Sequence, residues 1–232
     1  MENNKIKILE KGMYLKKQIE DTGWEDILYP WIESENFFSV MSKLINFSNE
    51  NKKFGPKLKD WFKPFIECPY DNVKVIFINI GPYNKLHDAD GIPFSCSNTN
   101  EEHSLLSYVF DALESDYPGY ERDVNLTRWC NQGVLMLNLA MTVQLNTTNN
   151  HFDLWEPFMT HLLKKINDDK SELVVVLFGN KTHSVKTLLS KQIIIDVKHP
   201  ATAAYNDKWE HDDVFNLINK KLITKNKTPV KW

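Results

Sequence analysis

Four short apolar runs divide the chain, and between them apolar residues recur at helical spacing. The runs cover residues 73–80, 134–140, 173–178 and 193–197, and all are rich in β-branched or bulky side chains. Such runs are typical of strands that are covered on both faces. Helical patterns over 104–113, 154–166 and 183–189 separate them. The alternation predicts a three-layer α/β/α fold around a central, mostly parallel four-stranded sheet.

The segments before the first strand predict a helical N-terminal part. Apolar residues over 24–47 lie near helical spacing, and Pro30 interrupts the pattern, so two short helices are expected. Residues 54–69 mix prolines with aromatics and are expected to form a packed connector. The first 22 residues are polar and lysine-rich, and we expect them to be loosely held. A length of 232 residues suits one domain spanning 1–232.

Composition narrows the class of protein. Hydrophobic residues make up 42% and charged residues 25%, as in soluble globular proteins. Neither a membrane span nor a secretory leader is expected, so we expect a cytoplasmic protein. Cys68, Cys96 and Cys130 are odd in number and far apart, which favours buried free thiols over zinc or disulfides. A net charge of -3 argues against a strongly basic DNA-coating protein, but it allows an enzyme that touches a few phosphates.

A polar residue or glycine stands at or just after the end of each apolar run. These positions follow Ile80 and include Asn138, Gly179 and His199. In parallel sheets ligands bind outside the carboxyl ends of the strands. The sequence therefore predicts a functional site where these four strand ends meet.

The segments at these strand ends resemble the motifs of family-1 uracil-DNA glycosylases. The matches are NIGPYN at 79–84 to GQDPYH, GIPFS at 91–95 to GLxFS, QGVLMLN at 132–138 to QGVLLLN, HPATAA at 199–204 to HPSPLS, and PVKW at 229–232 to a PIDW-like tail. The resemblance covers roughly residues 24–232, in order and at family-like spacing. It implies a glycosylase fold that holds one base flipped out of DNA.

The resemblance implies a role for each matching position. Phe94 would stack on the flipped base, and Asn138 would hydrogen-bond its pyrimidine edge. Tyr83 would sit against C5, and His199 would donate to O2 as negative charge develops on the departing base. The other positions expected around the base are Ile80 and Gly81. The positions expected near the DNA backbone are Pro82, Ser95, Ser104, Gly179, Asn180, Ala201 and Thr202.

The chain departs from the family where water is activated. The aspartate that orients the water aligns with Gly81, and the histidine after the tyrosine aligns with Asn84. Asp88 and Asp90 lie on the loop between Tyr83 and Phe94, and Asn79 ends the preceding strand. These three residues are therefore candidate catalytic replacements, beside His199.

The loops expected to grip DNA depart as well. The leucine that wedges into the vacated stack aligns with Ala203 or Ala204, and an acidic segment at 100–103 replaces a proline-rich loop.

Two main functions remain open. One is a monofunctional DNA glycosylase that hydrolyses the N-glycosidic bond of a flipped pyrimidine and leaves an abasic site. Gly81 would enlarge the pocket, so a modified pyrimidine is favoured over uracil; hypermodified phage DNA, attacked in host defence within a bacterial or phage-infected cell, is one such substrate. The other is a catalytically inactive DNA-binding or replication-partner protein. Plain uracil-DNA glycosylase activity is a further alternative.

Other classes are less well supported by the sequence. The acid-rich stretches at 101–102, 168–169 and 210–213 raise the alternative of a DNA mimic, but solvated faces explain them better. The pocket motifs hold no lysine for a Schiff base, so no covalent intermediate is expected. We expect a monomer that acts on DNA without a metal or cofactor, and a protein partner only for the inactive form.

Overall fold

A parallel sheet forms the centre of the computed structural model, which describes residues 2–148, 151–205 and 208–232. Its strands are β2 (Val75–Asn79), β3 (Val134–Asn138), β5 (Val174–Phe178) and β6 (Ile193–Val197), in the spatial order β3-β2-β5-β6. All neighbouring strands pair in parallel. Each strand falls inside one of the four apolar runs, so the predicted sheet is confirmed.

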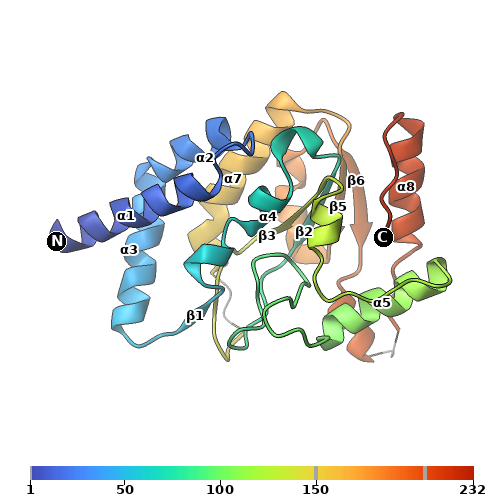
Figure 1. Ribbon diagram of the computed structural model, residues 1–232, viewed down its shortest axis with the longest axis horizontal. Coiled ribbons are helices and arrows are strands. Elements are labelled where there is room, and N and C mark those ends of the chain that lie inside the picture. Colours follow the sequence, from blue (N-terminus) through green and yellow to red (C-terminus); the bar gives the residue numbers. More distant parts are fainter. Residues whose placement is uncertain (1, 149–150, 206–207) are drawn as a thin grey trace.

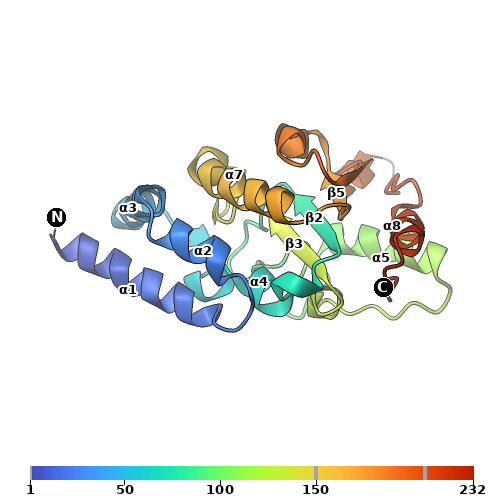
Figure 2. The same ribbon diagram turned by 90° about the horizontal axis from the view of Figure 1, so that it is seen from above.

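Helices lie on both sides of this sheet. In Figure 2, α7 (Phe152–Asp169) lies on one side, and α5 (Ser104–Asp116) and α8 (Val214–Thr224) lie on the other. Every residue of β2, β3 and β5 is buried, which explains why these strands are continuous apolar runs. The remaining helical segments are α4 (Lys63–Glu67), α6 (Thr127–Cys130), and the 3-10 segments η1 (Leu58–Asp60), η2 (Tyr70–Asn72), η3 (Asn180–Leu188) and η4 (Pro200–Tyr205).

The N-terminal helices form a group beside the sheet (Figure 1). They are α1 (Glu2–Gln18), α2 (Glu25–Ile32) and α3 (Glu35–Asn49). The expected pair of helices over 24–47 is present, but the break lies at Ser34 and not at Pro30, which sits inside α2. The Ser34 hydroxyl accepts from the backbone N–H of Phe37 at 3.2 Å, so an N-cap sets the start of α3.

The N-terminus also differs from the expected loose segment. Residues 2–18 form α1, in which Ile8 and Leu15 are buried. Residues seven apart lie on the same face of a helix, so a sparse apolar stripe suffices to hold α1 against α2 and α3.

A short two-stranded sheet and the packed C-terminal residue are two further features of the fold. Strands β1 (Phe54–Gly55) and β4 (Val143–Gln144) pair antiparallel, and β1 lies in the segment 54–69 that was expected to be a connector. The C-terminal Trp232 stacks on Phe77 of β2, with ring centroids 5.9 Å apart. None of the described helices has the length and apolar character needed to span a bilayer.

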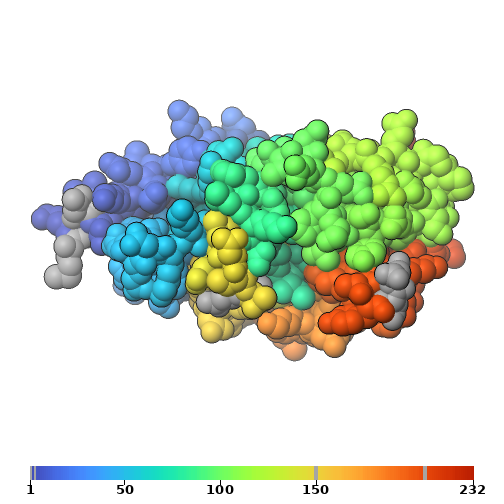
Figure 3. Space-filling model, turned by 90° about the horizontal axis from the view of Figure 1, so that it is seen from below, coloured from blue at the N-terminus to red at the C-terminus, as the bar shows by residue number. Residues whose placement is uncertain are grey.

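The carboxyl ends of the strands define one face of the molecule. The loops that follow β2, β3 and β6, drawn green, yellow and orange-red, come together on the face shown in Figure 3. We call this surface the strand-end face.

Candidate functional site

A small cavity of about 60 Å³ opens at the carboxyl ends of β2 and β3. Seven residues predicted for the site line it together, although they come from four separate segments. The full lining is Asn79, Gly81, Pro82, Tyr83, Ala89, Gly91, Ile92, Pro93, Phe94, Leu105, Asn138 and His199. The cavity therefore joins three of the four strand ends expected to meet, those of β2, β3 and β6, whereas Gly179 after β5 does not line it.

The sheet register places the two asparagines of the cavity side by side. Asn79 and Asn138 are directly paired as the last residues of β2 and β3, and both are 4% exposed. The Asn79 Nδ2 donates to Asn138 Oδ1 at 2.8 Å and to the carbonyl of Gly81 at 3.2 Å. His199, two residues beyond β6, lies with its Nε2 2.8 Å from Asn79 Oδ1. Three polar side chains from three strand ends are thus bonded in a row.

His199 is held as a neutral imidazole. Burial lowers its pKa from 6.5 to about 4. The backbone N–H of Ala201 donates to Nδ1 at 3.1 Å, which leaves the ring proton on Nε2. The Nε2–H then donates to Asn79 Oδ1, so the imidazole is a preset donor at the end of the cavity.

Two aromatic rings wall the cavity. Phe94 is 4% exposed and packs edge-on against Phe178, with ring centroids 5.2 Å apart. The Tyr83 hydroxyl donates to the backbone carbonyl of Phe94 at 2.9 Å, and burial raises the pKa of this phenol, so it stays a donor. His103 stacks on Tyr83 at 4.1 Å. Sequence reasoning did not single out His103, which lies in the acidic segment at 100–103.

Asp90 anchors the loop that carries Phe94. It is fully buried and accepts from the Ser95 hydroxyl at 2.6 Å, from the Ile92 N–H at 3.0 Å and from Lys63 Nζ at 3.1 Å. Asp88 lies apart, 3.9 Å from Nε2 of His103. Neither carboxylate lines the small cavity. Their catalytic role stays a prediction, and the donors that surround Asp90 come from its own loop and from Lys63.

Ile80, which was expected beside the base, lies outside the small cavity, and Gly179 lies close to His199. The side chain of Ile80 lies beside Gly179. Gly179 has φ 84°, and a Cβ there would be 3.0 Å from the Cβ of His199. The glycine is needed for this close approach as well as for its backbone conformation.

The other candidates for DNA-backbone contact are distributed unevenly. Ser95 is fully buried, so its hydroxyl does not reach the surface. The remaining candidates are exposed or half-buried, and they are Pro82, Ser104, Asn180, Ala201 and Thr202. Sequence reasoning did not single out Tyr205, which is 88% exposed at the end of η4. Ala203, one of the two positions aligned with the wedging leucine, is buried.

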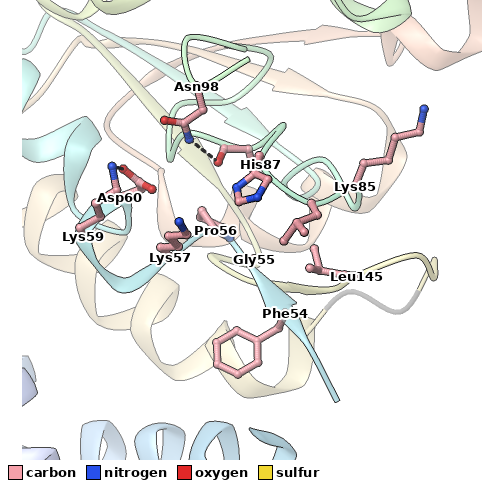
Figure 4. A pocket seen from close by; sticks show the side chains of 12 residues that line it. Phe54, Gly55, Pro56, Lys57, Lys59, Asp60, Lys85, His87, Asn98 and Leu145 are labelled. Carbon is pink, nitrogen blue, oxygen red and sulfur yellow. Dashed lines mark hydrogen bonds and ion pairs between the residues drawn. The ribbon is translucent and has the colours of Figure 1, made fainter. Parts of the chain in front are cut away.

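A second cavity, of about 240 Å³, shares Ala89 with the first. Figure 4 shows the side chains that line this second cavity. We call it the lysine cavity, because Lys57, Lys59 and Lys85 line it. The rest of its lining is Phe54, Gly55, Pro56, Asp60, Leu86, His87, Ala89, Asn98 and Leu145. Lys59 pairs with Asp60 at 3.6 Å, whereas Lys57 and Lys85 form no ion pair within the described residues. No motif predicts this cavity, since its lysines come from separate segments.

Comparison with known proteins gives consistent matches. The sequence profile of the Uracil DNA glycosylase superfamily matches residues 65–223. A uracil-DNA glycosylase of Amoebophilus asiaticus is 28% identical over 211 residues, covering 88% of this chain and 96% of the relative. Uracil-DNA glycosylase 1 of Listeria innocua is 29% identical over 220 residues, covering 90% and 96%.

The fold has a close counterpart among solved structures. The crystal structure of mimivirus uracil-DNA glycosylase superposes with a TM-score of 0.82 and covers 94% of this chain and 88% of that one. At 22% sequence identity, this likeness shows a shared fold.

Proposed function

Because the chain belongs to the uracil DNA glycosylase superfamily, we propose that it is a monofunctional DNA glycosylase that releases uracil from DNA. The observation that carries the proposal is the neutral His199, bonded through Asn79 to Asn138 beside the ring of Phe94. This set offers a donor for a leaving base, an amide for its edge and a ring for its face. All three lie in one cavity at the strand ends.

The cavity suits a base that has left the duplex stack. A glycosidic bond inside a duplex is out of reach, so the nucleotide must be extruded into a pocket. Phe94 would stack on the ring, the amide of Asn138 would bond the edge that carries N3 and O4, and Tyr83 would face C5. Tyr83 is fixed from two sides, by its bond to the Phe94 carbonyl and by the His103 ring. A rigid ring there disfavours a 5-methyl group.

His199 supplies the chemistry of the leaving group. When the bond between N1 and C1′ breaks, its electron pair goes to the base, and negative charge develops on the ring and on O2. A buried, preoriented N–H stabilises that charge without reorganisation. Water then adds to C1′ and gives up a proton, while the base takes one up, so the products are free uracil and an abasic site.

The lining of the small cavity provides no evident general base to activate the attacking water. Gly81 stands where the resembled motif has aspartate, and no carboxylate is among the lining residues. The oxygen of Asn79 is already engaged by His199. We therefore propose that leaving-group stabilisation supplies most of the acceleration and that water adds without a general base.

The size of the cavity favours uracil over a bulky modified base. Gly81 led us to expect an enlarged pocket, yet the cavity measures only about 60 Å³. This volume supports a small planar base that the loops close around, and it gives no support to a glucosylated pyrimidine.

The lysine cavity supports a path for the DNA backbone. Lys57 and Lys85 line a cavity that adjoins the small one and form no ion pair with the described residues, so their charge is available to a phosphate. Two side chains of the acid-rich stretches are paired, Glu102 with Arg122 at 2.7 Å and Glu210 with Lys198, which supports solvated faces rather than a DNA mimic.

One observation favours a second candidate function. The absence of a carboxylate from the lining of the small cavity would also fit a protein that binds DNA without cutting it. A panel of oligonucleotides separates the two functions. The panel holds uracil, thymine, cytosine or glucosylated hydroxymethylcytosine at one position, and alkaline cleavage detects abasic sites. Cleavage at uracil alone is expected. Silence on every oligonucleotide, together with measurable DNA binding, would put the second function first.

A further inference from the structure

Three hydrogen bonds connect two backbone groups through the side chains of His199 and Asn79, and a fourth joins Asn79 to Asn138. The N–H of Ala201 donates to His199 Nδ1 at 3.1 Å, and His199 Nε2 lies 2.8 Å from Asn79 Oδ1. Asn79 Nδ2 donates to the Gly81 carbonyl at 3.2 Å and to Asn138 Oδ1 at 2.8 Å. We call the row of His199, Asn79 and Asn138 the amide bridge.

The polarity of the amide bridge is fixed from both ends. A backbone N–H can only donate, so Nδ1 of His199 carries no proton and Nε2 carries the single proton of the neutral ring. The atom of Asn79 that faces Nε2 must therefore be its oxygen. A backbone carbonyl can only accept, so the atom of Asn79 that faces Gly81 must be its nitrogen. Both backbone groups thus demand the same orientation of the Asn79 amide.

The orientation of Asn138 follows from that of Asn79. One N–H of the Asn79 amide donates to the Gly81 carbonyl, and the other needs an acceptor, which the oxygen of Asn138 provides. If the Asn138 amide flipped, two donors would meet at 2.8 Å in a buried place and the hydrogen bond would break. In the orientation that remains, Asn138 Nδ2 has no partner among the described residues, and Asn138 lines the cavity. Its amide N–H is therefore available to a ligand.

We propose that Asn79 is a positioning residue that fixes the tautomer of His199 and the amide orientation of Asn138, so that the cavity prefers a pyrimidine with a carbonyl group at C4 to one with an amino group. This inference rests on the proposed function for its substrate. The resembled motif has glycine at this position, so the bridge belongs to this chain. It also gives Asn79 a different task from water positioning, because its oxygen is occupied by His199.

The first experiment needs no DNA and tests the bridge in the free protein. Imidazole ¹⁵N NMR at pH 7 is expected to show His199 as one neutral tautomer, with a slowly exchanging proton on Nε2. In Asn79→Ala the acceptor is gone, so the tautomers mix and that proton exchanges faster. Identical spectra from the two proteins would overturn the bridge, whether or not the protein releases any base.

The second experiment reverses the polarity of the bridge. In Asn79→Asp, the introduced carboxylate can only accept, so Asn138 turns its Nδ2 toward it and presents oxygen to the cavity. The ratio of base release from uracil to that from cytosine, at one position of a single-stranded oligonucleotide, is expected to fall at least about tenfold. The matched control is Asn46→Asp, the same change at an exposed position of α3, which should leave the ratio unchanged.

The outcomes separate this inference from the proposed function. An unchanged ratio in a folded Asn79→Asp protein overturns the positioning role while base release stands. If this variant does not fold, Asn79→Ala replaces it, and the freed amide should lower the ratio in the same direction. If the wild type releases no base at all, the proposed function fails, and the NMR comparison alone decides on the bridge.

Discussion

The small cavity and the lysine cavity are neighbours that share Ala89, yet they hold their polar groups in opposite ways. In the small cavity Asn79 and Asn138 are 4% exposed and bonded to each other. In the lysine cavity Lys57 and Lys85 are exposed and without ion pairs among the described residues. Base chemistry needs preset donors, because reorganisation would cost part of the stabilisation. Phosphate contacts need only nearby positive charge, so flexible side chains suffice.

The largest effect is expected from removing Asp90, which anchors the loop that carries Phe94 at the small cavity. Asp90→Ala leaves Lys63 and Ser95 without their carboxylate, so the free energy of unfolding should fall by about 3 kcal/mol. Asp88→Ala, the matched change at a partly exposed carboxylate, should cost less than about 0.5 kcal/mol. Denaturant unfolding measures both. A stable Asp90→Ala protein that had lost base release would instead make Asp90 catalytic.

Acidification should lower the free energy of unfolding, because His199 in the small cavity is held neutral. The pKa of His199 falls from 6.5 to about 4 on folding, so the unfolded chain takes up a proton at a higher pH than the folded one. Stability is therefore complete above pH 6.5 and is lost as the pH falls toward 4, by up to about 1.4 kcal/mol per unit. Burial also lowers the pKa of His103 and of His151, so they act in the same direction.

The contribution of His199 to this pH dependence can be isolated by comparison. Denaturant unfolding of wild type and His199→Ala at pH 7.5, 5.5 and 4.5 should show a shallower decline in the variant. Parallel declines would contradict a buried, neutral His199.

A smaller change would displace His199 without removing it. Gly179→Ala places a Cβ 3.0 Å from that of His199 and strains a backbone with φ 84°, so stability should fall by about 1–3 kcal/mol and base release about tenfold. Gly119 has φ 87° with nothing within 4 Å of a built Cβ. Gly119→Ala should therefore lose some stability and keep its rate. Equal rates in the two folded variants would mean that the position of His199 is not critical.

The smallest effect is expected in the lysine cavity. Replacing Lys57 and Lys85 together by Gln should weaken binding to duplex DNA several-fold at low salt. It should also lower the slope of log affinity against log salt by up to about 1.8, because each phosphate that a lysine neutralises adds about 0.9 to that slope. The control replaces Lys220 and Lys221 of α8, which are exposed and do not line the cavity. An unchanged slope would remove the lysine cavity from the DNA path.

The sequence predicts the strands and the residues at their ends, but not the contacts between residues that are far apart in the chain. The strands follow from runs of buried apolar residues, and the places of Asn138 and His199 follow from their positions at strand ends. The contact between Asn79 and His199 joins residues 120 positions apart, and it depends on strand order, which periodicity does not report.

Hydrogen-bond partners are what the sequence could not predict. Asp90 is a plausible catalytic acid in sequence, but three loop residues and Lys63 supply its donors. Likewise Ser95 has a hydroxyl suited to a phosphate, yet it points into the loop toward Asp90. The residue type determines which hydrogen bonds a side chain can form, whereas the fold determines which partners it has.

The most direct test of the whole account is a single-turnover measurement of uracil release, with enzyme in excess over a uracil-containing oligonucleotide, for wild type and His199→Ala. The account predicts measurable release by the wild type and a rate at least about 100-fold lower in the variant, since a preset donor to a developing anion contributes about 3 kcal/mol. DNA binding should be nearly the same for both proteins, and the variant should stay folded at pH 7.5 with a loss of about 1–3 kcal/mol, because Asn79 Oδ1 loses its donor. Equal rates for the two proteins, or no release by the wild type at saturating DNA binding, would contradict it.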